Sequence, residues 1–134
     1  MRYHTNTHGP SEAGFKAGFL KAISEASANG TKEVLLLTHG LQNLQGVITS
    51  VLGESAVKDF EKTRVTNAGD VKIYLETERI RSAFSKGVIF APFVSLTLLA
   101  VAAGDFRATD VVFVPWAESE LQSYVQTSPS SVQL

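Results

Sequence analysis

The chain has 134 residues and no cysteine, and its 12 Lys and Arg nearly balance 13 Asp and Glu, for a formal charge of -1. A chain of this length can bury a hydrophobic core of its own, and the absent cysteines exclude disulfides, thiolate metal sites and a cysteine nucleophile. The charge balance gives no support for a nucleic acid or an anionic membrane as partner, because both require a basic surface.

The first predicted element is an extended segment over residues 2–8. Tyr3, Thr5 and Thr7 alternate with four charged or polar residues, and so polar a strand is expected at the edge of a sheet. The N-terminus has no apolar segment of the signal-peptide type, so we expect a cytoplasmic protein.

An amphipathic helix is predicted next. Ser11 before an acidic residue is typical of a helix N-terminus, apolar residues recur at helical spacing over 15–26, and Asn29-Gly30 predicts a left-handed stop. Gly14 and Gly18 lie four residues apart on this helix. Because glycine costs about 1 kcal/mol relative to alanine inside a helix, the pair predicts that another element packs closely against it, within the subunit or across a dimer.

The rest of the chain predicts further strands and helices. Short continuous apolar runs, typical of strands covered on both faces, occur at 34–38, 88–91 and 111–114. Residues 71–76 alternate instead, which predicts a half-exposed peripheral strand with Lys72, Tyr74 and Glu76 on its polar face. Helical patterns occupy 41–60, with an interruption at Gly53, and also 95–103 and 117–126, and residues 66–70 are typical of a turn.

Strands that alternate with helices predict a parallel sheet between two helical layers, because parallel strands need crossover connections. We therefore predict a three-layer α/β/α sandwich, a Rossmann-like and mostly parallel sheet of about four to five strands with a polar N-terminal edge strand. Residues 1–126 form a single domain in this prediction, and residues 127–134 form a flexible C-terminal tail that is too polar to pack.

One long uncharged stretch has the length of a possible transmembrane helix. The 18 uncharged residues between Lys86 and Asp105 reach the length at which a transmembrane helix becomes a candidate. Pro92 near the middle, the glycines at both ends and the absence of a Lys or Arg cluster on one flank favour a strand, a turn and a buried helix instead. An interface with another protein is a further alternative for this apolar stretch.

In an open parallel sheet, ligands bind beyond the carboxyl ends of the strands. Polar or aromatic residues suited to binding follow the predicted strand ends, and the candidates are His39, Gly40, Asn43, Arg79, Ser95, Thr97 and Trp116. We expect them to form a pocket for a polar or anionic small ligand such as a nucleotide or metabolite. Trp116, the sole tryptophan, is either a wall of that pocket or a lid on the core.

His39 is also the candidate for acid–base chemistry. A histidine oriented by a carboxylate, here Glu78 or Glu118, is suited to act as a general base near neutral pH. The alternative is a histidine that caps the following helix or bonds a loop carbonyl, and the lack of an accompanying nucleophile motif favours it.

The sequence offers only weak candidates for a phosphate site and for a metal site. The segment 8–14 joins a strand to a helix with Lys16 nearby, but it lacks a Walker ending and Pro10 removes one N–H donor. His4 and His8 have a spacing that chelates a metal on a helix, whereas on a strand they lie about 13 Å apart. The sequence therefore predicts no metal site and leaves any cofactor undefined.

The order of strand, Gly-Pro-Ser-Glu, amphipathic helix and apolar strand over residues 3–40 resembles the C-terminal α/β domain of pyruvate kinase and its stand-alone relatives. That resemblance covers under a third of the chain and implies only a similar architecture. The Ser/Thr-Gly anion loop of that family is replaced here by Thr38-His39-Gly40-Leu41, so no residue roles are transferred.

Three functions remain open, in this order. The first is a small ligand-binding domain, the second is an interaction or assembly module, with homo-oligomerisation as the default for such a sheet, and the third is a hydrolase or transferase that uses His39.

Overall fold

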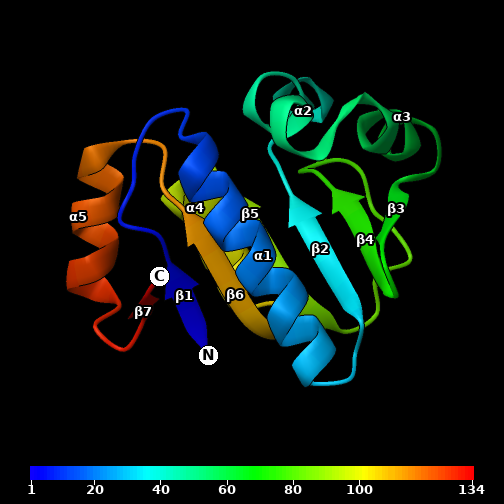
Figure 1. The fold of residues 1–134 in the computed structure, drawn as a ribbon. Coiled ribbons are helices and arrows are strands. Elements are labelled where there is room, and N and C mark those ends of the chain that lie inside the picture. The colour runs from blue at the N-terminus through cyan, green and yellow to red at the C-terminus, as the bar shows by residue number, and fades with distance from the viewer.

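Seven strands in the order β3-β4-β2-β5-β6-β1-β7 form one sheet in the computed structural model, which describes residues 1–134 (Figure 1). The strands are β1 (Arg2–His4), β2 (Glu33–Leu37), β3 (Val65–Ala68), β4 (Val71–Glu76), β5 (Gly87–Pro92), β6 (Ala108–Val114) and β7 (Val132–Gln133). The helices are α1 (Glu12–Ala28), the short 3-10 helix η1 (Leu41–Leu44), α2 (Val47–Leu52), α3 (Glu54–Thr63), α4 (Leu96–Ala103) and α5 (Glu118–Thr127). Every strand pair is parallel except β3 with β4.

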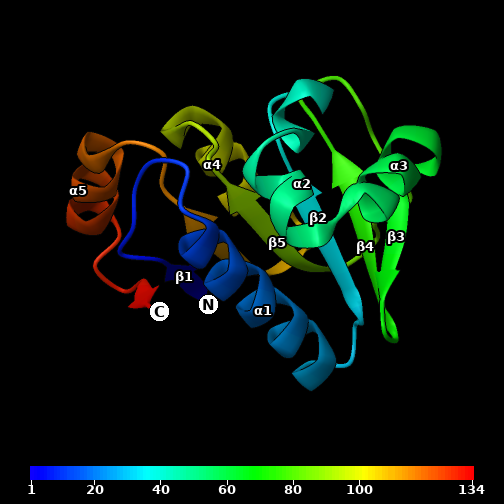
Figure 2. The same ribbon diagram turned by 45° about the horizontal axis from the view of Figure 1, so that its top comes forward.

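Helices cover both faces of the sheet, which confirms the predicted three-layer α/β/α sandwich. Helices α1, α2 and α3 lie on one face, and α4 and α5 on the other (Figures 1 and 2). Alternate residues of each central strand serve the two layers: in β2, Val34 and Leu36 pack toward α1, and Leu35 and Leu37 pack toward α4. Strands buried on both faces therefore appear in the sequence as continuous apolar runs.

The paired glycines of α1 allow this helix to approach the sheet closely. A methyl group added at Gly18 would lie 2.8 Å from the Phe90 ring and 2.9 Å from Cγ2 of Val114. A methyl group at Gly14 would collide with the hydroxyl group of Thr7. The close packing that these glycines predict is thus found within the chain: Gly18 lies against β5 and β6, and Gly14 lies against Thr7 in the segment after β1.

The two strands that the sequence did not predict are short. β3 pairs with β4 through a turn at Gly69, where only a turn was expected, and β7 lies in the segment predicted to be too polar to pack. Neither strand has a strong alternation, and each is held by pairing with a neighbour.

The N-terminal strand is not at the edge, which corrects the prediction. β1 lies between β6 and β7, and His4 is only 5% exposed. The imidazole of His4 packs edge-on against Tyr124, and its Nδ1 lies 2.8 Å from the hydroxyl oxygen of Ser131. Burial lowers the pKa of His4. His4 is therefore covered by α5 and the C-terminal segment, whereas Arg2 of the same strand is exposed.

The apolar stretch between Lys86 and Asp105 forms β5, a turn and α4, as predicted. None of the helices in the structure combines the length and the apolar character needed to cross a bilayer.

Candidate functional site

A cleft of about 420 Å³ lies at the carboxyl ends of β2, β5 and β6, the edge of the sheet that is turned toward the viewer in Figure 2. Its lining residues come from the segments that follow these strands and from the start of α2 and the loop before α1. They are Pro10, Thr38, His39, Gln42, Asn43, Gln45, Gly46, Val47, Ile48, Pro92, Phe93 and Trp116. This volume is within the range of small-molecule sites.

Aromatic side chains form one wall of the cleft. The rings of Phe93 and Trp116 meet edge to face with their centroids 5.4 Å apart. Phe93 also stacks on the fully buried Phe15, with centroids 6.2 Å apart, so the wall is continuous with the core under α1. Trp116 itself remains 50% exposed, which makes it a pocket wall and not a core lid.

Phe93 has a left-handed backbone conformation with φ of 62°. In a residue other than glycine this conformation costs about 1–2 kcal/mol, because Cβ approaches the carbonyl oxygen. The backbone N–H of Phe93 donates to the carbonyl oxygen of Val114 at 2.8 Å, so the end of β6 holds Phe93 in place. Such strain persists where the surrounding structure imposes it, and it is concentrated at functional sites.

His39 joins two elements at the rim of the cleft. Its Nε2 accepts a 2.9 Å hydrogen bond from the backbone N–H of Ser95, and its Nδ1 lies 3.5 Å from a carboxylate oxygen of Glu78. These contacts fit the tautomer in which Nδ1 carries the proton and Nε2 accepts. Two carboxylates were predicted to orient His39. Glu78 lies beside it, whereas Glu118, at the start of α5, lines a separate hollow together with His8.

The segment after β2 supplies three amide side chains to the lining of the cleft, those of Gln42, Asn43 and Gln45. Oδ1 of Asn43 accepts a 2.9 Å hydrogen bond from the N–H of Gly40, and the hydroxyl of Thr38 donates to the Gly40 carbonyl oxygen at 3.1 Å. These bonds fix the turn that leads into η1. Gln42 and Gln45 are exposed, and their side chains make no hydrogen bond to another residue of the chain. Their amide groups are therefore free to bind a ligand.

No Lys, Arg, Asp or Glu side chain lines the cleft. The carboxylate of Glu78, beside His39, lies outside the cleft and lines a second hollow described below. The lining of the cleft therefore consists of apolar, aromatic, hydroxyl and amide side chains together with the imidazole of His39.

The structure brings together some of the predicted binding residues. His39, Asn43 and Trp116 line the cleft, and Gly40 and Ser95 contact its lining residues through the hydrogen bonds given above.

Two predicted binding residues lie elsewhere. Arg79 is in the loop after β4, where its N–H donates to the hydroxyl oxygen of Thr77, and Thr97 is exposed on α4. Neither lines the cleft.

Sequence reasoning missed several lining residues, chiefly Pro10, Gln42 and Gln45. The apolar stripe over 41–52 predicts one helix, but Gly46, with φ of 76°, separates η1 from α2 in the structure. Its isolated glycine, preceded by two glutamines and an asparagine, is the signal that would have indicated a loop at this point.

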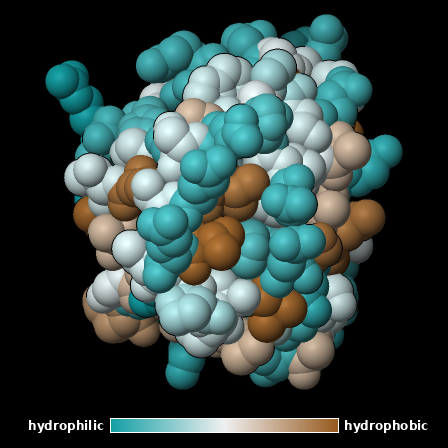
Figure 3. Space-filling model, turned by 90° about the vertical axis from the view of Figure 1, so that its left-hand side faces the viewer, coloured by the Kyte–Doolittle hydropathy of each residue, from teal (hydrophilic) through white to brown (hydrophobic).

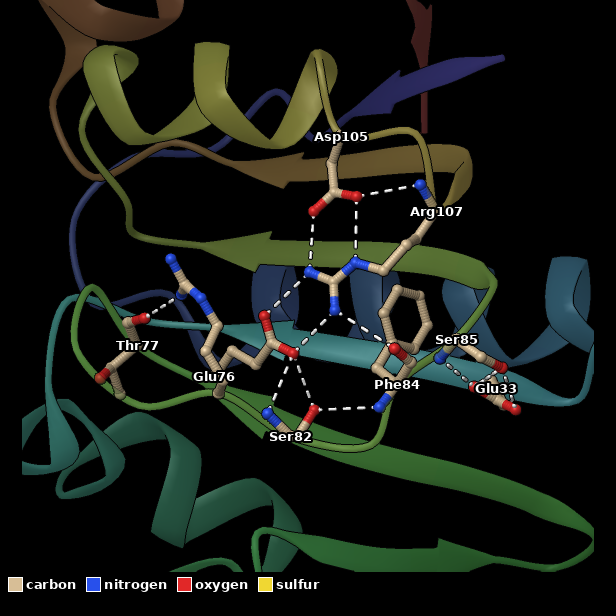
Figure 4. A network of polar contacts seen from close by, with 9 residues as sticks. Glu33, Glu76, Thr77, Ser82, Phe84, Ser85, Asp105 and Arg107 are labelled. Atoms are coloured by element: carbon tan, nitrogen blue, oxygen red, sulfur yellow. Dashed lines mark hydrogen bonds and ion pairs between the residues drawn. The ribbon is translucent and has the colours of Figure 1, made fainter.

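A buried network of ion pairs lies on the face of the sheet opposite α1 (Figure 4). Glu76, placed by its alternating pattern on an exposed face, is only 1% exposed, which corrects that prediction. Nη1 and Nη2 of Arg107 each donate a 2.9 Å hydrogen bond to the carboxylate of Glu76. Nη2 and Nε of Arg107 also donate to the carboxylate of Asp105, at 2.8 and 3.0 Å respectively. A hydrogen bond to the Phe84 carbonyl oxygen at 3.2 Å completes the five N–H donors of Arg107.

The network covers a part of the sheet that no helix covers. Residues 77–86 cross over β2 between β4 and β5, and Ser82 donates both its N–H and its hydroxyl to Glu76. Burial alone would raise the pKa of Glu76, but the hydrogen bonds from Arg107 and Ser82 outweigh it and hold that pKa below its ordinary value. The hydrogen bond from Arg107 likewise lowers the pKa of Asp105.

A second hollow, of about 710 Å³, lies beside this network. Its apolar lining includes Leu37, Ile89, Leu98 and Val101, and Phe106 at its rim is 92% exposed. By contrast, the face over α5 is mainly hydrophilic, with hydrophobic side chains in small separate patches (Figure 3).

No group of three or more His, Asp or Glu side chains is placed to hold a metal ion. Comparison of the chain with protein families, with curated proteins and with solved structures finds no match. Fold and site together define a three-layer α/β/α domain with a cleft at the carboxyl edge of its sheet that no Lys, Arg, Asp or Glu lines.

Proposed function

We propose that this chain is a binding domain for a small polar ligand, held in the cleft at the carboxyl ends of β2, β5 and β6. The observation that carries the proposal is the convergence of three strand ends on one cleft of about 420 Å³. This is the edge at which open α/β sheets bind ligands. The left-handed conformation of Phe93, on the wall of the same cleft, supports it.

Binding is favoured over acid–base catalysis by the contacts of His39. A general base must offer a free lone pair to the substrate within hydrogen-bond reach. The lone pair of Nε2 already accepts the N–H of Ser95, and Nδ1 faces Glu78. His39 thus acts as a connection between β2 and α4 that shapes the cleft.

A thermal-unfolding screen of the purified protein against nucleosides, sugars, carboxylates and phosphates tests the proposal. A ligand at 100 times its Kd adds about 2.7 kcal/mol and raises Tm by several degrees. Because Trp116 is the sole tryptophan, its fluorescence reports occupancy of the cleft directly. Stabilisation that persists unchanged in Trp116→Ala would place the ligand elsewhere and contradict the proposal, with Gln126→Glu as the control variant outside the cleft.

A second candidate function is assembly with a second copy of this chain. Phe106 is 92% exposed beside the second hollow, whose lining is half apolar and half polar or charged. A two-fold axis would allow each Phe106 to contact apolar residues of the partner's hollow, such as Leu98 and Val101. Analytical ultracentrifugation of the wild type and of Phe106→Ser tests this candidate. A dimer that dissociates in Phe106→Ser supports it, and a wild-type monomer at high concentration contradicts it.

A further inference from the structure

We infer that the ligand of the cleft is an uncharged flat heterocycle of the nucleobase class, bound by stacking and by amide hydrogen bonds. This inference rests on the proposed function and narrows it.

The charge of the lining residues limits which ligands can enter the cleft. A phosphate or carboxylate bound in the cleft would need cationic partners to offset its desolvation, and neither Lys nor Arg lines the cleft. His39, the one lining residue that can carry a positive charge, already engages both ring nitrogens, Nε2 with the N–H of Ser95 and Nδ1 with the carboxylate of Glu78. A charged group on the ligand must therefore remain outside, and the part that enters is neutral.

The shape of the wall is a further constraint on the ligand. Phe93 and Trp116 present aromatic surface that is anchored through Phe15 to the core, so it is preorganised. Aromatic side chains bind bases by stacking, because every base has a flat π face. Because the two rings meet edge to face, a flat heterocycle can stack on one of them while the other ring borders its edge.

The amide side chains in the lining of the cleft supply its hydrogen-bonding capacity. Asn43 uses Oδ1 to accept from Gly40, so its Nδ2 offers two donors, while Gln42 and Gln45 offer both donors and acceptors. The edges of nucleobases carry donors and acceptors side by side, and Asn and Gln pair with them through two bonds at once. The cleft therefore has neutral partners for the edge of a base and stacking partners for its face.

Isothermal titration calorimetry with adenosine, guanosine, cytidine and uridine, their 5′-monophosphates, and glucose and galactose tests the inference. We expect one or more nucleosides to bind and to change Trp116 fluorescence, and the corresponding monophosphate to bind no more tightly. Trp116→Ala should weaken nucleoside binding about tenfold or more, whereas Trp116→Phe, which retains a stacking surface, should lose less.

An amide variant tests the hydrogen-bonding step. Asn43→Asp retains an oxygen acceptor for the Gly40 N–H but loses both donors and adds a charge, so it should also weaken nucleoside binding at least tenfold. Gln126→Glu, an exposed amide-to-acid change on α5, is the matched control and should bind as the wild type does.

The outcomes separate the inference from the proposed function. Binding of a sugar in the cleft without binding of nucleosides, or a monophosphate that binds tenfold more tightly than its nucleoside, overturns the inference and leaves the proposed function in place. If no compound binds to the folded protein, both are overturned. Nucleoside binding that Trp116→Ala and Asn43→Asp leave unchanged also overturns both, because it places the site outside the cleft.

Discussion

The backbone N–H of Ser95 donates to Nε2 of His39 across 56 residues of sequence, and this bond ties the carboxyl end of β2 to the start of α4. Ser95 also caps α4, since its hydroxyl oxygen accepts the N–H of Leu98 at 3.2 Å. One imidazole thus links the segment after β2 to the start of α4 beside the cleft.

Replacing His39 by alanine should therefore lower stability, because the N–H of Ser95 loses its acceptor. We expect a loss of about 1–2 kcal/mol in the free energy of unfolding, measured by urea denaturation. His39→Gln, which carries a side-chain acceptor, should lose less, and His8→Ala, at an exposed position, should change little. Equal losses in the alanine and glutamine variants would show that the hydrogen bond is not responsible.

The ion network of Arg107 predicts strong coupling between its members. Arg107→Met leaves the carboxylate of Glu76 buried without its bidentate partner, which should cost about 3–5 kcal/mol. The double variant Arg107→Met with Glu76→Leu removes the buried charge as well and should recover much of that loss. Urea denaturation of both variants checks this, and a double variant less stable than the single one would contradict it.

The lowered pKa values of Glu76 and Asp105 predict how stability depends on acid. A carboxyl group whose pKa is lower in the folded chain than in the unfolded chain stabilises the fold fully above its unfolded value near 4. That contribution is lost as the pH falls through the folded pKa. Denaturation at pH 7 and over pH 5–2 should show stability falling below about pH 4, with a shallower fall in Arg107→Met.

Substituting Gly18 by alanine tests the close approach of α1. Alanine gains about 1 kcal/mol in helix propensity but must displace Phe90 and Val114, and overpacking typically costs about 1–3 kcal/mol. We expect net destabilisation in thermal unfolding. Ser24→Ala, an exposed change on the same helix, is the control and should be neutral or slightly stabilising; if Gly18→Ala behaves in the same way, the contact is not tight.

Hydrophobic periodicity was sufficient to predict the layers of the fold. Continuous apolar runs identified β2, β5 and β6 because these strands are buried on both faces. The same reasoning failed at Glu76, because a buried carboxylate looks like an exposed one until its partner is known. Arg107 lies 31 residues further along the chain, and only the folded sheet brings the two together.

The position of the cleft was predictable, but its chemistry was only partly so. The rule for parallel sheets placed His39, Asn43 and Trp116 at one edge, and all three line the cleft. Gln42 and Gln45 were missed because the break at Gly46 was hidden within an apolar helical stripe.

The loop over residues 77–86 bonds much of its backbone to side chains instead of to strands. The N–H groups of Ile80, Ser82 and Ser85 donate to oxygens of Thr77, Glu76 and Glu33, respectively. Amide hydrogen exchange in this loop should therefore follow the local integrity of these side-chain contacts, not global unfolding. The exchange rates of these amides would therefore report whether the loop is packed on the face of the sheet opposite α1 or has locally detached from it.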